Sequence, residues 1–296
     1  MTTVDAALTR VLHHCNGSTR QMIDALDGAL TDTSDEVALL YDYADGLAPG
    51  QWVEVNNEPM LILEKNEAVL KVLRGTTSYT PQVHAGGSLV RLAPRTFRYE
   101  IIDDLKAEVL TLGNNIYGYT DVTVTFPETR TWADLPTSGE DVIGLVAAYA
   151  PGSSEHEAIK KSPMTLVPGS AIEGASGDWC VQHGLNASLW YTNGRDVQVW
   201  YAFRPDTSAF DYDTDLETDV GLSAEVVEAV IYGAAYREMM RREAARANIS
   251  DMSQGRIEEM PPQHNAQVAE MFRRTRSQLL AAESYRLQNK FPIRIV

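Results

Sequence analysis

Apolar residues recur at helical spacing at the start of the chain. Val4, Leu8, Val11 and Leu12 recur in a predicted helix that ends at Asn16-Gly17, two residues that tolerate a positive φ. Ser18 can cap a second helix. Its apolar side would consist of Met22, Ile23, Leu26 and Leu30. Residues 1–34 are therefore predicted to form a helical hairpin.

Short alternating runs replace this pattern over residues 35–93. The runs are 37–40, 51–55, 58–63 and 68–73. Turn residues such as Pro49-Gly50 and Asn56-Asn57 separate them. This spacing predicts a small antiparallel β module.

A third helix is predicted over residues 94–113. Apolar residues return every three or four positions after Pro94: Phe97, Ile101, Leu105, Val109 and Leu112. Gly113 stands where a glycine commonly ends a helix.

Residues 114–210 again have the pattern of strands. The segments are TDVTVTF, DVIGLVAAYA, MTLV, NASLWYT and DVQVWYAF. Asn193-Gly194 favours a hairpin between the last two. We expect an inserted domain that resembles a β-sandwich.

The last third of the chain is predicted to be mainly helical. An acidic linker, 211–220, precedes a long-helix pair over 221–289, and residues 290–296 form a C-terminal arm. The first long helix has adjoining stripes of Leu222, Val226, Val230 and Ala234, and of Val227, Ile231 and Ala235, and continues to Met239. After Pro261-Pro262, the second is marked by Val268, Met271, Phe272, Leu279 and Leu287, opposite an arginine-rich face that should stay solvated.

Together these segments predict an α+β fold. It would be a helical bundle that carries a small N-terminal antiparallel β module and the inserted β-sandwich-like domain. Gly233, Ala234 and Ala235 are small enough to let another helix approach closely.

Charge is unevenly distributed along the 296 residues. The net charge is −16, and 11 basic and 9 acidic residues lie from Gly221 onward, which leaves the first 220 residues at −18. An acidic body argues against wrapping nucleic acid. No apolar stretch approaches the ~20 residues needed to span a bilayer, and no secretion signal is recognisable. Cys15 and Cys180 are expected to be reduced thiols.

The segment VLRGTTSYTPQVHAGGSLVRL, residues 72–92, contains groups that could form a small active site. They are Arg74, Ser78, Tyr79 and His84. Nothing near them marks an acid partner or an oxyanion hole, and the glycines suit a tight loop that returns into a strand. We interpret the segment as a joint, with His84 hydrogen-bonding across it.

Four other patterns resemble catalytic or metal-binding motifs but match them only in part. Residues 174–177 lack the second glycine of a nucleophile elbow. Asp206, Asp211, Asp213 and Asp215 depart from a calcium-binding EF-hand loop, which leaves either a looser calcium site or a solvated acidic linker. The groups His13-His14-Cys15 and Cys180 with His183 lack further metal ligands. No cofactor-binding motif is present.

Aromatic residues are concentrated in the inserted domain. They are Trp179, Trp190, Tyr191, Trp200 and Tyr201. Because strand residues alternate, one of each consecutive pair should point inward. Core packing is the default, and saccharide binding by stacking is the alternative.

The stretch from Asp45 to Leu92 resembles a β module that is common in virion proteins of tailed bacteriophages. That module has a glycine-proline turn, an "I-D-x-E" strand pair, an Arg-Gly strand end, a Thr-rich loop, and a histidine followed by glycine. The corresponding residues are Pro49-Gly50, Val55 to Glu58, Arg74-Gly75, Thr76 to Thr80, and His84 with Gly86-Gly87. Ser78 replaces a glycine that the loop often has.

The stretch VGLSAEVVEAVIYGAAYREMMRREAARANI, residues 220–249, with its following proline turn and long helix, resembles the helical part of phage head-to-tail adaptors. The resemblance implies a structural protein of the virion neck, assembled in the host cytoplasm, without catalysis or cofactor. It implies a ring of the chain with itself, a dodecamer, between the portal and the downstream neck, stopper or tail protein. Genome DNA would pass through its lumen without sequence-specific binding, and no membrane would be involved.

The same resemblance suggests interface residues. Gly233 and Ala234 would permit lateral packing, and the arm would reach into the portal. The residues expected to contact the portal are Arg286, at the end of the long helix, and Lys290, Phe291, Ile293, Arg294 and Val296 of the arm. Arg286, Lys290 and Arg294 either pair with acidic portal residues or are simply solvated. The alternatives are a tail-tip or baseplate protein whose β insert binds saccharide, and a cell-wall hydrolase.

Overall fold

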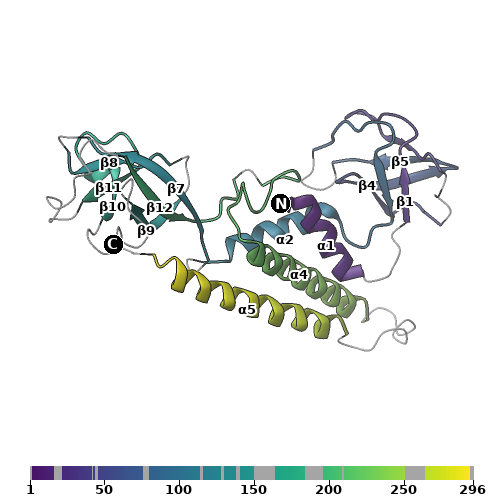
Figure 1. Ribbon diagram of the computed structural model, residues 1–296. Helices are drawn as coiled ribbons and strands as arrows, with labels where there is room; N and C mark the ends of the chain where they lie inside the picture. Colours follow the sequence, from purple (N-terminus) through teal and green to yellow (C-terminus); the bar gives the residue numbers. More distant parts are fainter. Residues whose placement is uncertain are drawn as a thin grey trace. The chain divides into compact units, whose positions relative to one another are not determined.

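The computed structural model describes residues 2–16, 22–41, 43, 46–75, 80–113, 116–127, 130–137, 141–149, 164–183, 196–208, 210–250 and 264–293. The chain divides into two compact units (Figure 1). Unit 1 holds Met1–Ala7, Lys106–Gly233 and Glu270–Val296. Unit 2 holds Leu8–Leu105 and Ala234–Ala269.

Six strands of unit 2 form one antiparallel sheet, which we call the β module. They are β1 (Met22–Ala25), β2 (Glu36–Ala38), β3 (Trp52–Val55), β4 (Glu58–Asn66), β5 (Val69–Leu73) and β6 (Leu89–Leu92). Their order is β1-β6-β3-β4-β5-β2, and the sheet curls until its two outermost strands meet. The Leu40 N–H donates to the Ala25 carbonyl, and the Asp27 N–H donates to the Ala38 carbonyl.

One face of the β module is its hydrophobic core. Alternation along β5 shows the reason: Leu70 and Val72 are buried, whereas Val69, Lys71 and Leu73 are exposed. Leu26, Leu30 and Leu39 close the core from the segments that join the strands.

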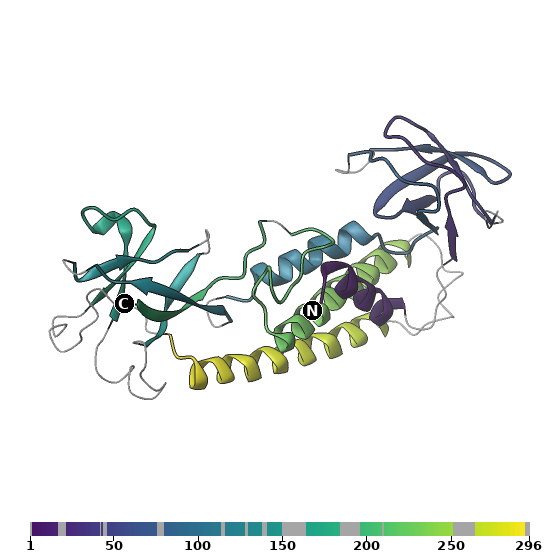
Figure 2. The ribbon, with the colours of Figure 1, turned by 45° about the horizontal axis from the view of Figure 1, so that its top comes forward.

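The β insert belongs to unit 1 and contains two three-stranded antiparallel sheets (Figures 1 and 2). Their strands are β7 (Gly118–Thr125), β8 (Trp132–Asp134), β9 (Val142–Tyr149), β10 (Met164–Pro168), β11 (Trp179–His183) and β12 (Asp196–Phe203). One sheet has the order β7-β12-β9 and the other β10-β11-β8. Val197, Val199 and Tyr201 of β12 share a core with Leu166 and Val181 of the other sheet.

Four α-helices complete the described part of the chain. They are α1 (Val4–Asn16), α2 (Arg98–Leu110), α4 (Ala224–Ser250) and α5 (His264–Lys290). The stripes expected on α4 are confirmed, since every member from Leu222 to Met239 is at most 5 % exposed. Gly113 has the expected positive φ of 71° just after α2.

The fold class expected from the sequence is wrong. The described residues contain twelve strands in three sheets and only four α-helices, so the protein is rich in β-structure and is not a helical bundle with a small β module. The long periodic segments gave a strong helical signal, whereas short strands such as β8 and β11 have little pattern of their own and depend on pairing.

Two local predictions are also wrong. The helix predicted after Ser18 does not form over residues 22–30, because Met22–Ala25 is β1, paired with β6. A four-residue apolar spacing fits a helix equally well, and only the distant partner strand decides. Met271 was placed on the buried side of α5 but is 56 % exposed. The hairpin at Asn193-Gly194 lies outside the described residues.

Candidate functional site

Three of the residues that carry the bacteriophage resemblance, Glu58, Arg74 and His84, meet at one buried carboxylate. Glu58, at the start of β4, accepts two hydrogen bonds from the Arg74 guanidinium, at 2.7 and 2.8 Å. The Gln82 N–H donates to it at 3.0 Å, and His84 Nε2 lies 2.8 Å away. The side chains of Glu58, Arg74 and His84 are 1 %, 5 % and 4 % exposed. A motif whose members are scattered along the sequence thus forms one network.

This network fixes the charge of Glu58. Burial opposes ionisation, but the hydrogen bonds from Arg74, His84 and the Gln82 N–H outweigh it and lower the pKa of Glu58 to about 2. Arg74 also donates to the carbonyls of Thr31, Ser34 and Gln82. The carboxylate and the guanidinium therefore tie together loops that are distant in sequence.

The interpretation of residues 72–92 as a joint agrees with this geometry. His84 forms a bridge with Leu30 through its backbone and reaches Glu58 and Asn56 through its ring. Ser78 and Tyr79, two of the four groups that could have formed a small active site, lie outside the described residues. The sequence identified Arg74 and His84 but missed Glu58 as their common partner, although Glu58 ends the motif's strand pair.

A second buried carboxylate joins the β module to α2. Glu54 of β3 accepts hydrogen bonds from Arg91 at 2.5 Å and from the Arg98 N–H, in the first turn of α2, at 2.7 Å. Burial raises the pKa of Glu54 to about 7, although Arg91 and the Arg98 N–H oppose the shift. Trp52 packs edge-on against Phe97, 5.5 Å between ring centroids. The start of α2 is thereby held against the sheet.

A third charged cluster lies between α2 and α4. Glu238, 2 % exposed, accepts hydrogen bonds from Arg241 and Arg242 at 2.7 Å and from the Thr96 hydroxyl. Arg241 also pairs with Asp104 at 2.9 Å. Burial raises the pKa of Asp104 to about 6 against the effect of Arg241. These acids are paired with arginines.

The metal readings of the cysteines find no support. Arg242 donates to the Cys15 carbonyl, and burial raises the pKa of the Cys15 thiol to about 12. The Cys180 thiol donates to Asp134, and burial and that carboxylate raise its pKa to about 11. Both thiols are free and protonated at neutral pH. Within the described ranges, no three His, Cys, Asp or Glu residues are placed to hold a metal ion.

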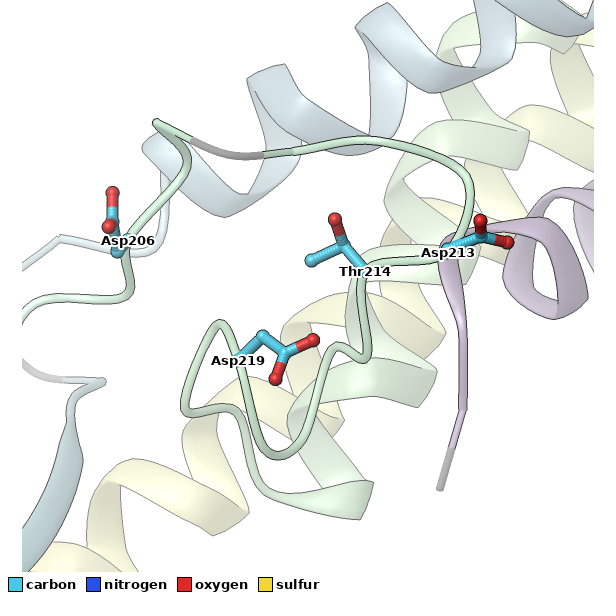
Figure 3. Close-up of a pocket in the computed structure, with 4 residues that line it drawn as sticks. All are labelled: Asp206, Asp213, Thr214 and Asp219. Atoms are coloured by element: carbon cyan, nitrogen blue, oxygen red, sulfur yellow. The ribbon is translucent and has the colours of Figure 1, made fainter.

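The acidic linker lines a hollow of about 300 Å³ (Figure 3). Asp206, Asp213, Thr214 and Asp219 surround it, but Figure 3 shows that the three carboxylates do not converge on one point. Asp206 instead accepts hydrogen bonds from Ser208, and Asp211 from the Tyr212 N–H. Asp215 accepts from the N–H groups of Glu217 and Thr218. The aspartates stabilise their own turns, as in the linker alternative.

The residues predicted for lateral packing are buried within their own chain. A Cβ on Gly233 would clash with Glu108 Oε2 of α2. Glu108 in turn pairs with Arg276 of α5 at 2.5 Å. Gly233 therefore makes room for an internal ion pair, and the adjacent Ala234 is fully buried.

The C-terminal arm packs on the β insert as far as it is described. Phe291 stacks on Tyr119 at 4.1 Å, and the Tyr117 hydroxyl donates to the Phe291 carbonyl at 2.7 Å. Ile293 contacts the same cluster. Arg286 pairs with Glu283 at 2.6 Å, and Lys290 is exposed. Arg294 and Val296 lie outside the described residues.

The aromatic pair on β12 alternates as predicted. Tyr201 is in the core of the insert, and Trp200 lies on the opposite face with Tyr119 and Phe291. Trp179 is packed against the core. Trp190 and Tyr191 lie outside the described residues.

No known protein family and no curated protein matches the chain. None of the helices in the described ranges is long and apolar enough to cross a membrane.

Proposed function

We propose that this chain is a structural virion protein of a tailed bacteriophage, a head-to-tail adaptor that assembles as a ring between the portal and the next neck or tail protein. The observation that supports a virion protein most is the network around Glu58, whereas the adaptor role rests on the resemblance of residues 220–249. The residues that carry the resemblance, Glu58, Arg74 and His84, have mutual contacts at hydrogen-bonding distance. They therefore act as one structural unit, as residues of a shared motif are expected to do.

The proposed mechanism is geometric. Buried carboxylates paired with arginine fix the β module, the start of α2 and the α2–α4 contact. Such pairs cost several kcal/mol to break, so they favour one defined shape. A rigid subunit of that kind suits a ring that must match its neighbours on both sides. DNA would pass through the ring without specific contacts.

The arm has to change its partner if it engages the portal. Phe291 and Ile293 are packed against Tyr119 and its neighbours in the free chain. Engagement of the portal by these side chains would therefore require their release from the insert. Such an exchange would couple portal binding to exposure of the aromatic face around Trp200.

Electron microscopy of the negatively stained protein, alone and mixed with portal protein, tests the proposal. We expect closed rings with a central opening, and rings stacked on portals in the mixture. Glu58→Gln, which should loosen the β module, provides a variant with impaired assembly. Single particles that neither form rings nor bind the portal would show that the proposal is wrong.

A further inference from the structure

The β module has an unusually apolar surface. Ten of the fourteen large hydrophobic residues that are exposed in the described part of the chain belong to residues 22–92. Scattered exposed apolar residues need no explanation, but a contiguous group indicates a contact surface. The strand register shows which of the ten lie together.

One group lies on the outer face of β3, β4 and β5. Trp52, Leu61 and Leu73 are directly opposite one another across the three strands. Leu63, 42 % exposed, follows at an irregularity of β4, and Leu73 is 44 % exposed. Val69 lies on the same face of β5, because it is four residues from Leu73 and every second residue of a strand points to the same side. We call these five residues the outer face.

The outer face has charged neighbours. Glu64 and Glu36 are opposite Lys71 on either side of β5. Over residues 22–92 the sequence has 11 acidic and 4 basic residues, a net charge of −7. Two of the four basic residues, Arg74 and Arg91, are buried against Glu58 and Glu54. The surface of the module is therefore acidic, and Lys71 lies between Val69 and Leu73 on the outer face.

The helix α5 has an exposed side with apolar residues in a segment whose net charge is positive. Met271, Arg274, Gln278, Ala281 and Tyr285 are all exposed and follow one another at intervals of three and four residues, so they share one side of the helix. Met271 and Tyr285 are 56 % and 72 % exposed. Arg274 is the only charged member of this α5 face. Over residues 264–290 the sequence has 5 basic and 2 acidic residues, a net charge of +3, although one of the five, Arg276, is paired with Glu108 of α2.

We propose that the outer face of the β module binds the α5 face of a second copy of this chain. Both surfaces have exposed apolar side chains, and the segments that carry them have opposite net charges, so contact removes apolar area from water and brings an acidic segment to a basic one. The two surfaces lie on different units of the chain. When two copies bind through unlike surfaces, the pair still has one free outer face and one free α5 face. Further copies can bind to these, and the repeated contact closes a ring or extends a filament. The inference rests on the proposed ring, whose subunit contact it specifies.

Two variants of the full chain separate the two surfaces. Leu63→Asp with Leu73→Asp disables the outer face, and Met271→Asp with Arg274→Glu disables the α5 face. All four positions are exposed, so we expect thermal unfolding close to that of the wild type. Val83→Asp and Leu110→Asp are matched controls, because these apolar side chains are 69 % and 67 % exposed and belong to neither surface.

Sedimentation velocity, with and without portal protein, measures assembly. We expect each double variant to remain at the monomer mass of 32.7 kDa while the wild type and both controls assemble. A mixture of the two double variants retains one intact outer face and one intact α5 face. It should give a species of two chains that does not grow further.

Three results would overturn the inference. If both double variants assemble like the wild type, rings form through other surfaces, and the proposed function stands without this contact. If only the outer-face variant fails and the α5 variant assembles normally, the module binds something other than α5. If the wild type stays monomeric with and without portal, both the contact and the proposed adaptor function are wrong.

Discussion

Replacing Arg74 with methionine tests whether the buried carboxylate of Glu58 holds the β module together. Methionine keeps much of the aliphatic length and removes the charge and all N–H donors. Glu58 would retain the Gln82 N–H and His84 as its partners. The carbonyls of Thr31, Ser34 and Gln82 would each lose a donor.

The magnitude follows from the pKa of Glu58. A value of about 2, against an ordinary 4.5, corresponds to about 3 kcal/mol at neutral pH, because each pKa unit is worth about 1.4 kcal/mol. Screening by solvent near the loops makes the free energy from the pKa smaller than this. Loss of one partner of a fully buried ion pair costs about 3–5 kcal/mol of unfolding free energy. We therefore expect Arg74→Met to lower the free energy of unfolding of the β module by about 2–4 kcal/mol.

Hydrogen exchange followed by mass spectrometry measures this loss locally. Amides of β3, β4 and β5 should exchange about 30-fold or more faster, since about 2 kcal/mol corresponds to that factor. Amides of β12, in the β insert, should be unchanged. Lys71→Met is the matched control, because Lys71 is exposed on β5 and its removal should change stability by less than about 0.5 kcal/mol.

The same experiment has a defined dependence on pH. The folded pKa of Glu58 lies below its ordinary value, so its stabilising contribution is present above about 4.5 and is lost as the pH falls toward 2. The difference between wild type and Arg74→Met should shrink over that range. Equal exchange in Arg74→Met and Lys71→Met at neutral pH would refute the reasoning.

Three further predictions follow. The folded pKa of Glu54 lies above its ordinary value, so its contribution to stability is present below about pH 4.5 and is lost as the pH rises through about 7. The free energy of unfolding of Glu54→Gln, measured in urea, should lack this dependence on pH. Gly233→Ala should lower stability by about 1–3 kcal/mol through its clash with Glu108, and Glu108→Ala in the same chain should relieve part of the loss in a thermal-unfolding cycle. Deletion of Phe291 to Val296 should leave a folded protein with red-shifted tryptophan fluorescence that no longer co-sediments with portal-containing heads; unchanged co-sedimentation would count against the arm's role.

Secondary-structure elements were predicted best from the sequence where the pattern within one segment determines the type of element. The stripe from Val226 to Met239 buries as expected, because each turn of a helix repeats the same side. The strands β3, β4 and β5 follow one another with short turns, so their alternation and turn residues sufficed. Segments whose partner is distant were less predictable: β1 pairs with β6, and its apolar residues fit a helix equally well.

The buried charges could not be predicted from spacing. Glu238 meets Thr96 across 142 positions, and Asp104 meets Arg241 across 137. A glutamate in a sequence is by default an exposed residue, and only its burial shows that it needs a partner. The motif around Glu58 is an intermediate case, because its letters could be recognised although its geometry could not.

The closure of the β module through residues 25–27 and 38–40 determines how this protein can meet others. The outermost strands of an open sheet offer unpaired amides and carbonyls to any extended peptide, whatever its sequence. Here Ala25, Asp27, Ala38 and Leu40 bond those groups to one another. Other copies at high local concentration during assembly must therefore recognise the module by its side chains. Non-specific strand exchange between copies is disfavoured at these positions.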